Sequence, residues 1–143
     1  HEGAVDSGAW EQNEEVRMTA IKRITIGVLA SGFAIGTVTH TLHLVNVGWI
    51  VFDDAPTWMN VYWTALTALD PLAAVLLIYR RPMGLALGAA IILSDVAINS
   101  YALYGLALPF GFLSLQLQTL FCGFLLGAVG FLATKHQARE ANR

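Results

Sequence analysis

The sequence predicts an all-α integral membrane protein, a four-helix antiparallel bundle with both termini in the cytoplasm. The first observation is composition, because 56% of the 143 residues are hydrophobic and only 13% are charged. A typical soluble domain carries about 25% charged residues. The second observation is that the apolar residues form four segments of membrane-spanning length. The third is that all 8 lysines and arginines fall on one side of the resulting topology.

The composition also excludes several classes of protein. The net charge is −2, so we expect no basic surface and no nucleic-acid partner. The single cysteine, Cys122, excludes a disulfide framework and a multi-thiol metal site. We therefore expect Cys122 to be a small packing residue.

The first 17 residues differ from the rest of the chain. They are acidic and contain no apolar run, so they do not form a signal peptide. Met18 begins a segment that looks like a natural start. We interpret residues 1–17 as an acidic tail or an added expression segment with at most a short surface helix. Residues 18–143 are then one transmembrane domain.

The predicted spans cover about residues 24–47, 58–79, 83–105 and 110–134. Each is long enough to cross a hydrocarbon core of about 30 Å as a helix. Lipid favours helices because every backbone polar group must be bonded within the segment. Residues 53–56 separate the first two spans, residues 80–82 separate the next two, and Pro109 opens the fourth. Such short connections favour antiparallel neighbours.

Basic residues indicate the orientation of these spans. They precede the first span, follow the fourth, and occupy the connection between the second and third: Arg17, Lys22, Arg23, Arg80, Arg81, Lys135, Arg139 and Arg143. The positive-inside rule places both termini in the cytoplasm, and we expect a bacterial cytoplasmic membrane. An aromatic belt is expected at the outer ends of the first two spans, from Trp49, Phe52, Trp58, Tyr62 and Trp63.

Small residues recur four positions apart in three of the spans. The pairs are Gly32 with Gly36, Gly84 with Gly88, and Gly123 with Gly127. This spacing lets helix backbones approach closely in lipid. We expect it to serve packing within the bundle, with a homo-oligomer or a larger membrane complex as the alternative.

Ionisable residues within the spans are the most informative ones, and they are His40, His43, Asp70 and Asp95. Such groups are costly in lipid, so they usually face the bundle interior and have a partner. No lysine or arginine lies within a span, so the aspartates are either protonated or paired with the histidines. At about 1.5 Å per residue, His40, Asp70 and Asp95 reach overlapping depths in the outer half. We predict one interior polar cluster around them.

Helical spacing adds further residues to the predicted cluster. The expected ligand-binding residues are His43, Trp63, Thr67, Asn99 and Gln116. Pro71 removes the backbone N–H that would bond the Thr67 carbonyl, so we predict a kink beside Asp70. The kink serves either a binding site or packing alone.

Two histidines on one helix face also raise the question of a metal or haem. His40 and His43 are three residues apart and could share a metal with Asp70 or Asp95. Haem would need another axial ligand, such as Met59 or a residue of a second subunit. We favour neither, predict no metal site, and leave the cofactor unknown. A static hydrogen-bonded network is the competing interpretation of the polar cluster.

Pro56-x-Trp58 enters the second span, and Asp70-Pro71 lies within it. With these residues, roughly positions 42–101 resemble the EXPERA group, which contains the emopamil-binding sterol isomerases and the sigma-2 receptor. It implies four helices around a polar pocket for sterols and cationic amphiphiles. Asp70 aligns with the acidic residue of the group's second helix. The other acidic residues of the group differ in type and spacing, so its catalytic set does not transfer.

These patterns predict an intramembrane pocket for a small hydrophobic or amphiphilic molecule, such as a sterol-like compound, a quinone or an isoprenoid. His40 would donate or accept a proton, with Asp70 and Asp95 as counter-charges. Asn99 and Gln116 would orient a polar head. The partners expected are membrane lipid or a hydrophobic small molecule. An accessory subunit of a larger membrane complex and an ion or proton transporter are the alternatives.

Overall fold

The computed structural model describes residues 3–140, with side chains described for residues 8–132. The elements are α1 (Gly3–Asn46), α2 (Thr57–Tyr79), α3 (Arg81–Ser100), the π-helix η1 (Tyr101–Gly105) and α4 (Phe112–Glu140). Residues 3–140 contain no strand, which confirms the all-α prediction. Four helices are long and apolar enough to cross a membrane, as expected for an integral membrane protein.

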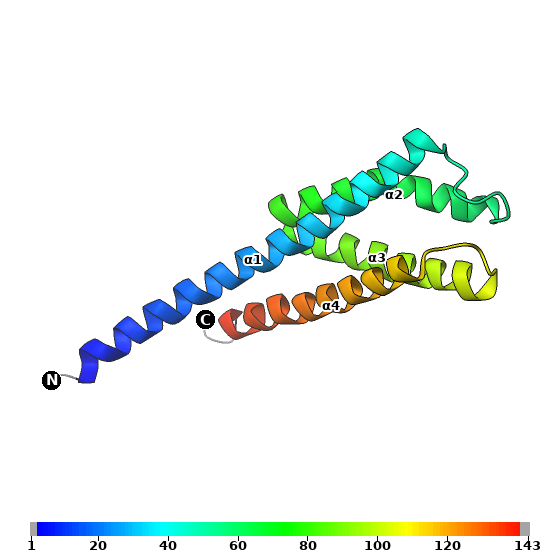
Figure 1. Ribbon diagram of the computed structural model, residues 1–143. Helices are drawn as coiled ribbons and strands as arrows, with labels where there is room; N and C mark the ends of the chain where they lie inside the picture. The colour runs from blue at the N-terminus through cyan, green and yellow to red at the C-terminus, as the bar shows by residue number, and fades with distance from the viewer. Residues whose placement is uncertain (1–2, 141–143) are drawn as a thin grey trace.

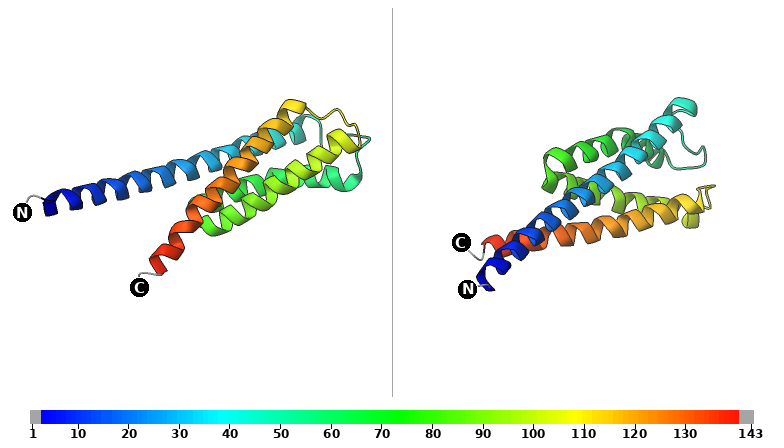
Figure 2. Two further views of the ribbon diagram at one scale, coloured as in Figure 1. Left: turned by 90° about the horizontal axis from the view of Figure 1, so that it is seen from below. Right: turned by 60° about the vertical axis from the view of Figure 1, so that its left-hand side comes forward.

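The first helix differs from the prediction. Residues 3–17 do not form a separate tail with a short surface helix, because α1 is one helix of 44 residues. This acidic part projects beyond the other helices (Figures 1 and 2). It lacks proline, contains helix-favouring Ala, Glu and Gln, and holds an ion pair of 3.5 Å between Arg17 and Glu14. Local propensity therefore extends the helix outside the packed region.

Successive helices pack against each other in chain order. α1 contacts α2, α2 contacts α3, and α3 contacts α4. The connection from α1 to α2 and the connection from η1 to α4 lie at one end of the molecule, which we call the loop end (Figure 1). The connection from α2 to α3 lies at the other end. The α1–α2 pair also contacts the α3–α4 pair directly, because the rings of Phe33 in α1 and Phe121 in α4 pack with their centroids 5.3 Å apart.

The core is formed by large apolar side chains that all four helices contribute. The largest fully buried ones are Leu29, Met59, Leu66, Leu77 and Leu125. In lipid there is little hydrophobic gain from burying them, so close packing and polar contacts hold the helices together.

Glycines in α1 and α3 allow several of these contacts. A Cβ on Gly84 would collide with the backbone of α2 at Leu76 and Leu77. A Cβ on Gly88 would press on the ring of Phe33, and one on Gly32 would collide with Phe121. The expected role in packing within the bundle therefore fits these glycines.

The glycines of α4 do not follow that expectation. Gly123 and Gly127 are exposed, and a Cβ on either would meet nothing within 4 Å. The buried face of α4 is formed instead by Leu115, Cys122 and Leu125. The predicted inward face of this helix was wrong, because large apolar side chains fill the core there and the glycines face outward.

The third predicted span changes character near its end. The α-helical part stops at Ser100, and η1 continues it to Gly105. In η1 the N–H of Leu106 donates to the carbonyl of Tyr101 at 3.0 Å. Pro71, where a kink was predicted, lies inside α2, which continues through it as one helix.

Asn60 of α2 holds the α1–α2 connection at the loop end through hydrogen bonds. Its side-chain oxygen accepts hydrogen bonds from the N–H groups of Val51 at 2.8 Å and Phe52 at 3.2 Å. Its amide nitrogen donates to the carbonyl of Phe52 at 3.0 Å. Asn60 is only 3% exposed, so this side chain holds the α1–α2 connection over the end of the helices.

Candidate functional site

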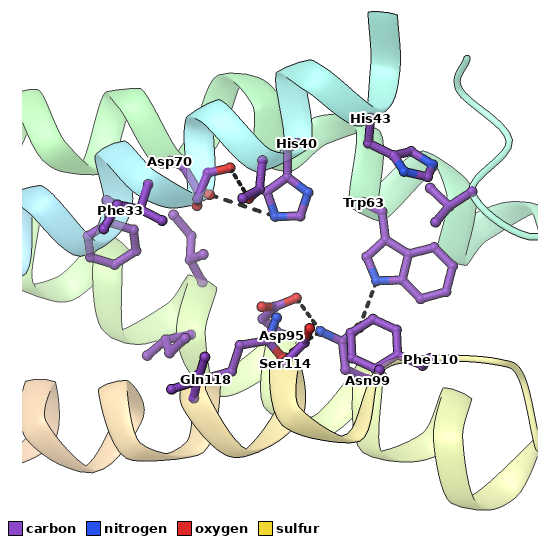
Figure 3. A pocket seen from close by; sticks show the side chains of 18 of the residues that line it. Phe33, His40, His43, Trp63, Asp70, Asp95, Asn99, Phe110, Ser114 and Gln118 are labelled. Carbon is purple, nitrogen blue, oxygen red and sulfur yellow. Dashed lines mark hydrogen bonds and ion pairs between the residues drawn. The ribbon is translucent and has the colours of Figure 1, made fainter. Parts of the chain in front are cut away.

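A cavity of about 620 Å³ lies between the helices near the loop end (Figure 3). Its volume is within the range of about 300–1,000 Å³ that is usual for small-molecule sites. The charged and polar side chains that line it include His40, His43, Trp63, Asp70, Asp95, Asn99, Ser114 and Gln118. The structure thus brings His40, Asp70 and Asp95 to one cavity, as the sequence analysis expected.

The wall formed by α1 and α2 carries His40 and Asp70. His40 Nε2 lies 3.9 Å from Asp70 Oδ2, which is an ion-pair distance but too long for a hydrogen bond. The Asp70 side chain is 7% exposed and that of His40 is 24% exposed. Asp70 lies directly over Gly36, where a Cβ would collide with its carboxylate. Gly36 therefore allows the acid of α2 to approach α1.

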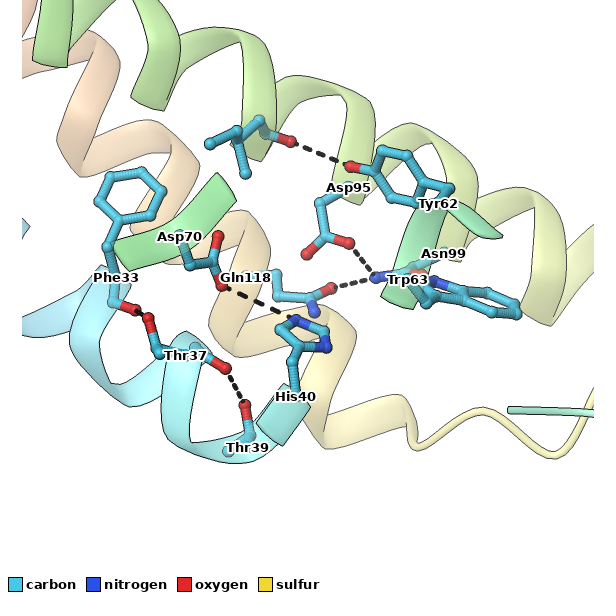
Figure 4. Close-up of polar contacts among 12 residues, drawn as sticks. Phe33, Thr37, Thr39, His40, Tyr62, Trp63, Asp70, Asp95, Asn99 and Gln118 are labelled. Atoms are coloured by element: carbon cyan, nitrogen blue, oxygen red, sulfur yellow. Dashed lines mark hydrogen bonds and ion pairs between the residues drawn. The ribbon is translucent and has the colours of Figure 1, made fainter. Parts of the chain in front are cut away.

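The wall formed by α3 and α4 carries a hydrogen-bonded network centred on Asn99 (Figure 4). Asn99 accepts a hydrogen bond of 2.8 Å from the indole N–H of Trp63. Its amide nitrogen donates to Asp95 Oδ1 and to Gln118 Oε1, both at 2.9 Å. Asn99 is 1% exposed, and it joins α2, α3 and α4 through these bonds. It holds the other polar groups in place, and both of its amide hydrogens are used within the protein.

The remaining predicted site residues divide into two groups. His43 and Trp63 line the cavity, and His43 Nε2 is buried without a hydrogen-bond partner in the part of the chain that the structure describes. Thr67 does not line the cavity, and its buried hydroxyl has no partner among the described residues. Gln116 is exposed and lies outside the cavity. The expectation that Thr67 and Gln116 face a ligand is therefore corrected.

Gln118 takes the position that was expected for Gln116. Sequence reasoning placed the glycines of α4 inward, and Gln116 shares their face. The signal that identifies Gln118 is its register with Leu115, Cys122 and Leu125, which recur at spacings of three and four residues. Together with Ala128, these three are the buried residues in the part of α4 whose side chains the structure describes.

Apolar and aromatic side chains form the rest of the cavity wall. Phe33 and Phe121 lie on the side away from the loop end, and Ile91 and Ile92 are contributed by α3. At the loop end, Phe52 packs edge-on against Trp63 with ring centroids 5.6 Å apart. The polar groups therefore lie on two walls of a mostly apolar chamber.

The cavity also contains both histidines of the motif for which a metal was considered. Among the side chains that the structure describes, no group of three His, Cys, Asp or Glu is arranged to hold a metal ion. The acids and His40 can accept hydrogen bonds from a molecule in the chamber or exchange a proton with it.

Comparisons with protein-family models, with curated proteins and with solved structures found no match to this chain. The functional conclusion therefore depends on the cavity and the residues that line it.

Proposed function

We propose that this membrane protein binds a small hydrophobic or amphiphilic molecule in the cavity between its four helices. The observation that carries the proposal is the chamber of about 620 Å³ with apolar walls, into which two aspartates and two histidines project. Ionisable groups at membrane depth are rare and usually functional. A network made only to fix helix register would not need a chamber of this size.

The ligand enters from the bilayer. Ile35 of α1 and Leu117 of α4 line the cavity and are 66% and 59% exposed. Exposed apolar side chains of a spanning helix face lipid, so we infer a lateral entrance between α1 and α4 at these two residues. A hydrophobic ligand then reaches the site without crossing water.

Acid–base chemistry on the ligand is part of the proposal. His40 and Asp70 form a pair on one wall, and Asp95 faces the cavity from the other wall. His40 exchanges the proton while the aspartates compensate its charge. A ligand pocket of this kind is also what the EXPERA resemblance implies.

Mass spectrometry of co-purified lipid tests the binding function. The wild-type chain, extracted in mild detergent, is expected to retain a molecule that His40→Ala and Asp95→Asn lose. Gln116→Ala is the matched control, because Gln116 is exposed and outside the cavity. An identical set of retained molecules in wild type and both cavity variants would reject the proposal.

We also propose an antiparallel bundle in a bacterial cytoplasmic membrane, with both termini in the cytoplasm. The support is that the α2–α3 connection carries Arg80 and Arg81, whereas the connections at the loop end carry no basic residue. The cavity then lies in the outer half. In a Cys122→Ala background, Asp53→Cys should react with an impermeant maleimide added to intact cells. Arg81→Cys should react only after permeabilisation, and the reverse pattern would overturn the orientation.

A second candidate function is that of an accessory subunit in a larger membrane complex. The outward position of Gly123 and Gly127 on α4 favours it, because this spacing supports close helix contact in lipid. Size analysis of the protein extracted in mild detergent separates the two functions. A stable monomer that retains a ligand would count against the accessory role.

A further inference from the structure

We propose that the ligand is a planar ring with hydrogen-bonding oxygen atoms on two opposite edges, as in a quinone or quinol, and with an apolar tail. This inference rests on the proposed function. It selects one ligand class from those that the cavity volume and its apolar lining admit.

The polar groups of the cavity form two separate walls. His40 and Asp70 face the cavity from α1 and α2, and Asp95 and Gln118 face it from α3 and α4 (Figure 3). No hydrogen bond or ion pair joins the first pair to the second among the side chains that the structure describes. A ligand with one polar end would bond to one wall only. The unused hydrogen-bonding groups of the other wall would then have no partner in a nonpolar chamber.

Each wall has hydrogen-bonding groups that the protein does not use. Gln118 uses its oxygen to accept from Asn99, so its amide N–H groups remain to donate into the cavity. Asp95 uses one carboxylate oxygen for the same partner, so the other remains to accept. The opposite wall offers the same combination, an imidazole from His40 and a carboxyl from Asp70. Each wall therefore suits one oxygen atom of the ligand. A carbonyl oxygen would accept a hydrogen bond from the N–H of that wall, and a hydroxyl would also donate one to its carboxylate.

The space between the two walls suits a flat ring with a tail. Phe33, Phe121 and the isoleucines of α3 provide apolar surfaces on which a flat ring can pack. Ile35 and Leu117 line the cavity and are largely exposed, so we take the space beside them as the opening through which an apolar tail reaches the lipid. A fused, rigid body would have to fill the chamber instead of extending through the opening.

Two tail-matched ligands test the inference on the full-length chain in nanodiscs. 2-Decylhydroquinone presents oxygens on two edges of its ring, whereas 3-decylphenol keeps the same tail position relative to its single oxygen. The bound fraction is measured by native mass spectrometry at equal mole fractions in the lipid. We expect the hydroquinone to bind about tenfold more tightly, the difference that one additional well-placed set of hydrogen bonds provides.

Variants on both walls make the result specific to this site. Gln118→Leu and His40→Asn, on opposite walls, should each reduce the hydroquinone preference to about twofold or less. Gln116→Leu, two residues from Gln118 on the outer surface, should leave it unchanged. Size-exclusion profiles verify that each variant is folded.

The outcomes separate this inference from the proposed function. Equal binding of the two ligands by wild type, or a preference that persists in both wall variants, overturns the two-edged ring. If 3-decylphenol or farnesol still binds and His40→Asn weakens it, the proposed function stands without the ring. If the wild-type protein binds none of these molecules more tightly than Gln118→Leu and His40→Asn do, both proposals fail.

Discussion

Replacing Asn99 by leucine should destabilise the bundle more than any other single polar substitution at the cavity. Leucine has the same number and branching of side-chain heavy atoms as asparagine, so the change removes the hydrogen bonds without opening a cavity. Asn99 is 1% exposed and makes three hydrogen bonds, to Trp63, Asp95 and Gln118. Two of these bonds connect different helices.

The magnitude follows from the bonds that cross between helices. Hydrogen bonds between helices in membranes contribute on average about 0.6 kcal/mol each, so the two bonds to Trp63 and Gln118 give about 1 kcal/mol. The substitution also leaves the indole N–H of Trp63 buried without an acceptor, which costs about 1–3 kcal/mol. We expect the free energy of unfolding to fall by about 2–4 kcal/mol.

The assay is reversible unfolding in mixed micelles with increasing SDS, followed by near-ultraviolet circular dichroism. Gln116→Leu is the control, because it adds the same side chain on the exposed face of α4. A double-mutant cycle with Trp63→Phe isolates one bond, and its coupling energy should be about 0.6–1.7 kcal/mol. A loss for Asn99→Leu no larger than that of Gln116→Leu would refute the view that this network joins the helices.

Three further predictions concern the fold around the cavity. Gly84→Ala should destabilise the bundle by about 2 kcal/mol or more in the same SDS assay, because the added Cβ meets the backbone of α2. Gly127→Ala should be neutral or stabilising by up to about 1 kcal/mol. Equal effects of the two substitutions would contradict the assigned helix faces. Tyr62→Phe should cost about 0.6 kcal/mol through loss of its hydroxyl contact of 2.8 Å with α3, and ligand retention should not change because this residue lies outside the cavity. Asn60→Ala should accelerate amide hydrogen exchange at residues 51–52 by about tenfold, since their N–H groups lose their acceptor; unchanged exchange would mean that the loop end is held by other contacts.

Much of the candidate site could be predicted because ionisable residues are rare in lipid. His40, Asp70 and Asp95 stand out in apolar segments, and helical spacing gives their approximate depth. The network partner Asn99 was also expected, one turn from Asp95 on the same face. Its role differs, since both of its amide hydrogens bind protein groups.

The choice between Gln116 and Gln118 could not be made in the same way. A helix turns about 100° per residue, so residues two positions apart lie on nearly opposite faces. The glycines of α4 suggested one rotation of the helix, whereas the larger residues Leu115 and Leu125 set the other. On the buried face of α4, large side chains fill the space between the helices, and the backbones do not approach closely there.

The sequence by itself determined the class of the protein, the number of apolar helices and the ionisable residues that they carry. Each of these follows from constraints within one segment, because a span must match the bilayer thickness and bond its own backbone. Tertiary structure alone decided the rotation of α4, the partners of Asn99 and the chamber between the two walls. Those features depend on how side chains from different helices fill a shared space, and no single segment contains that information.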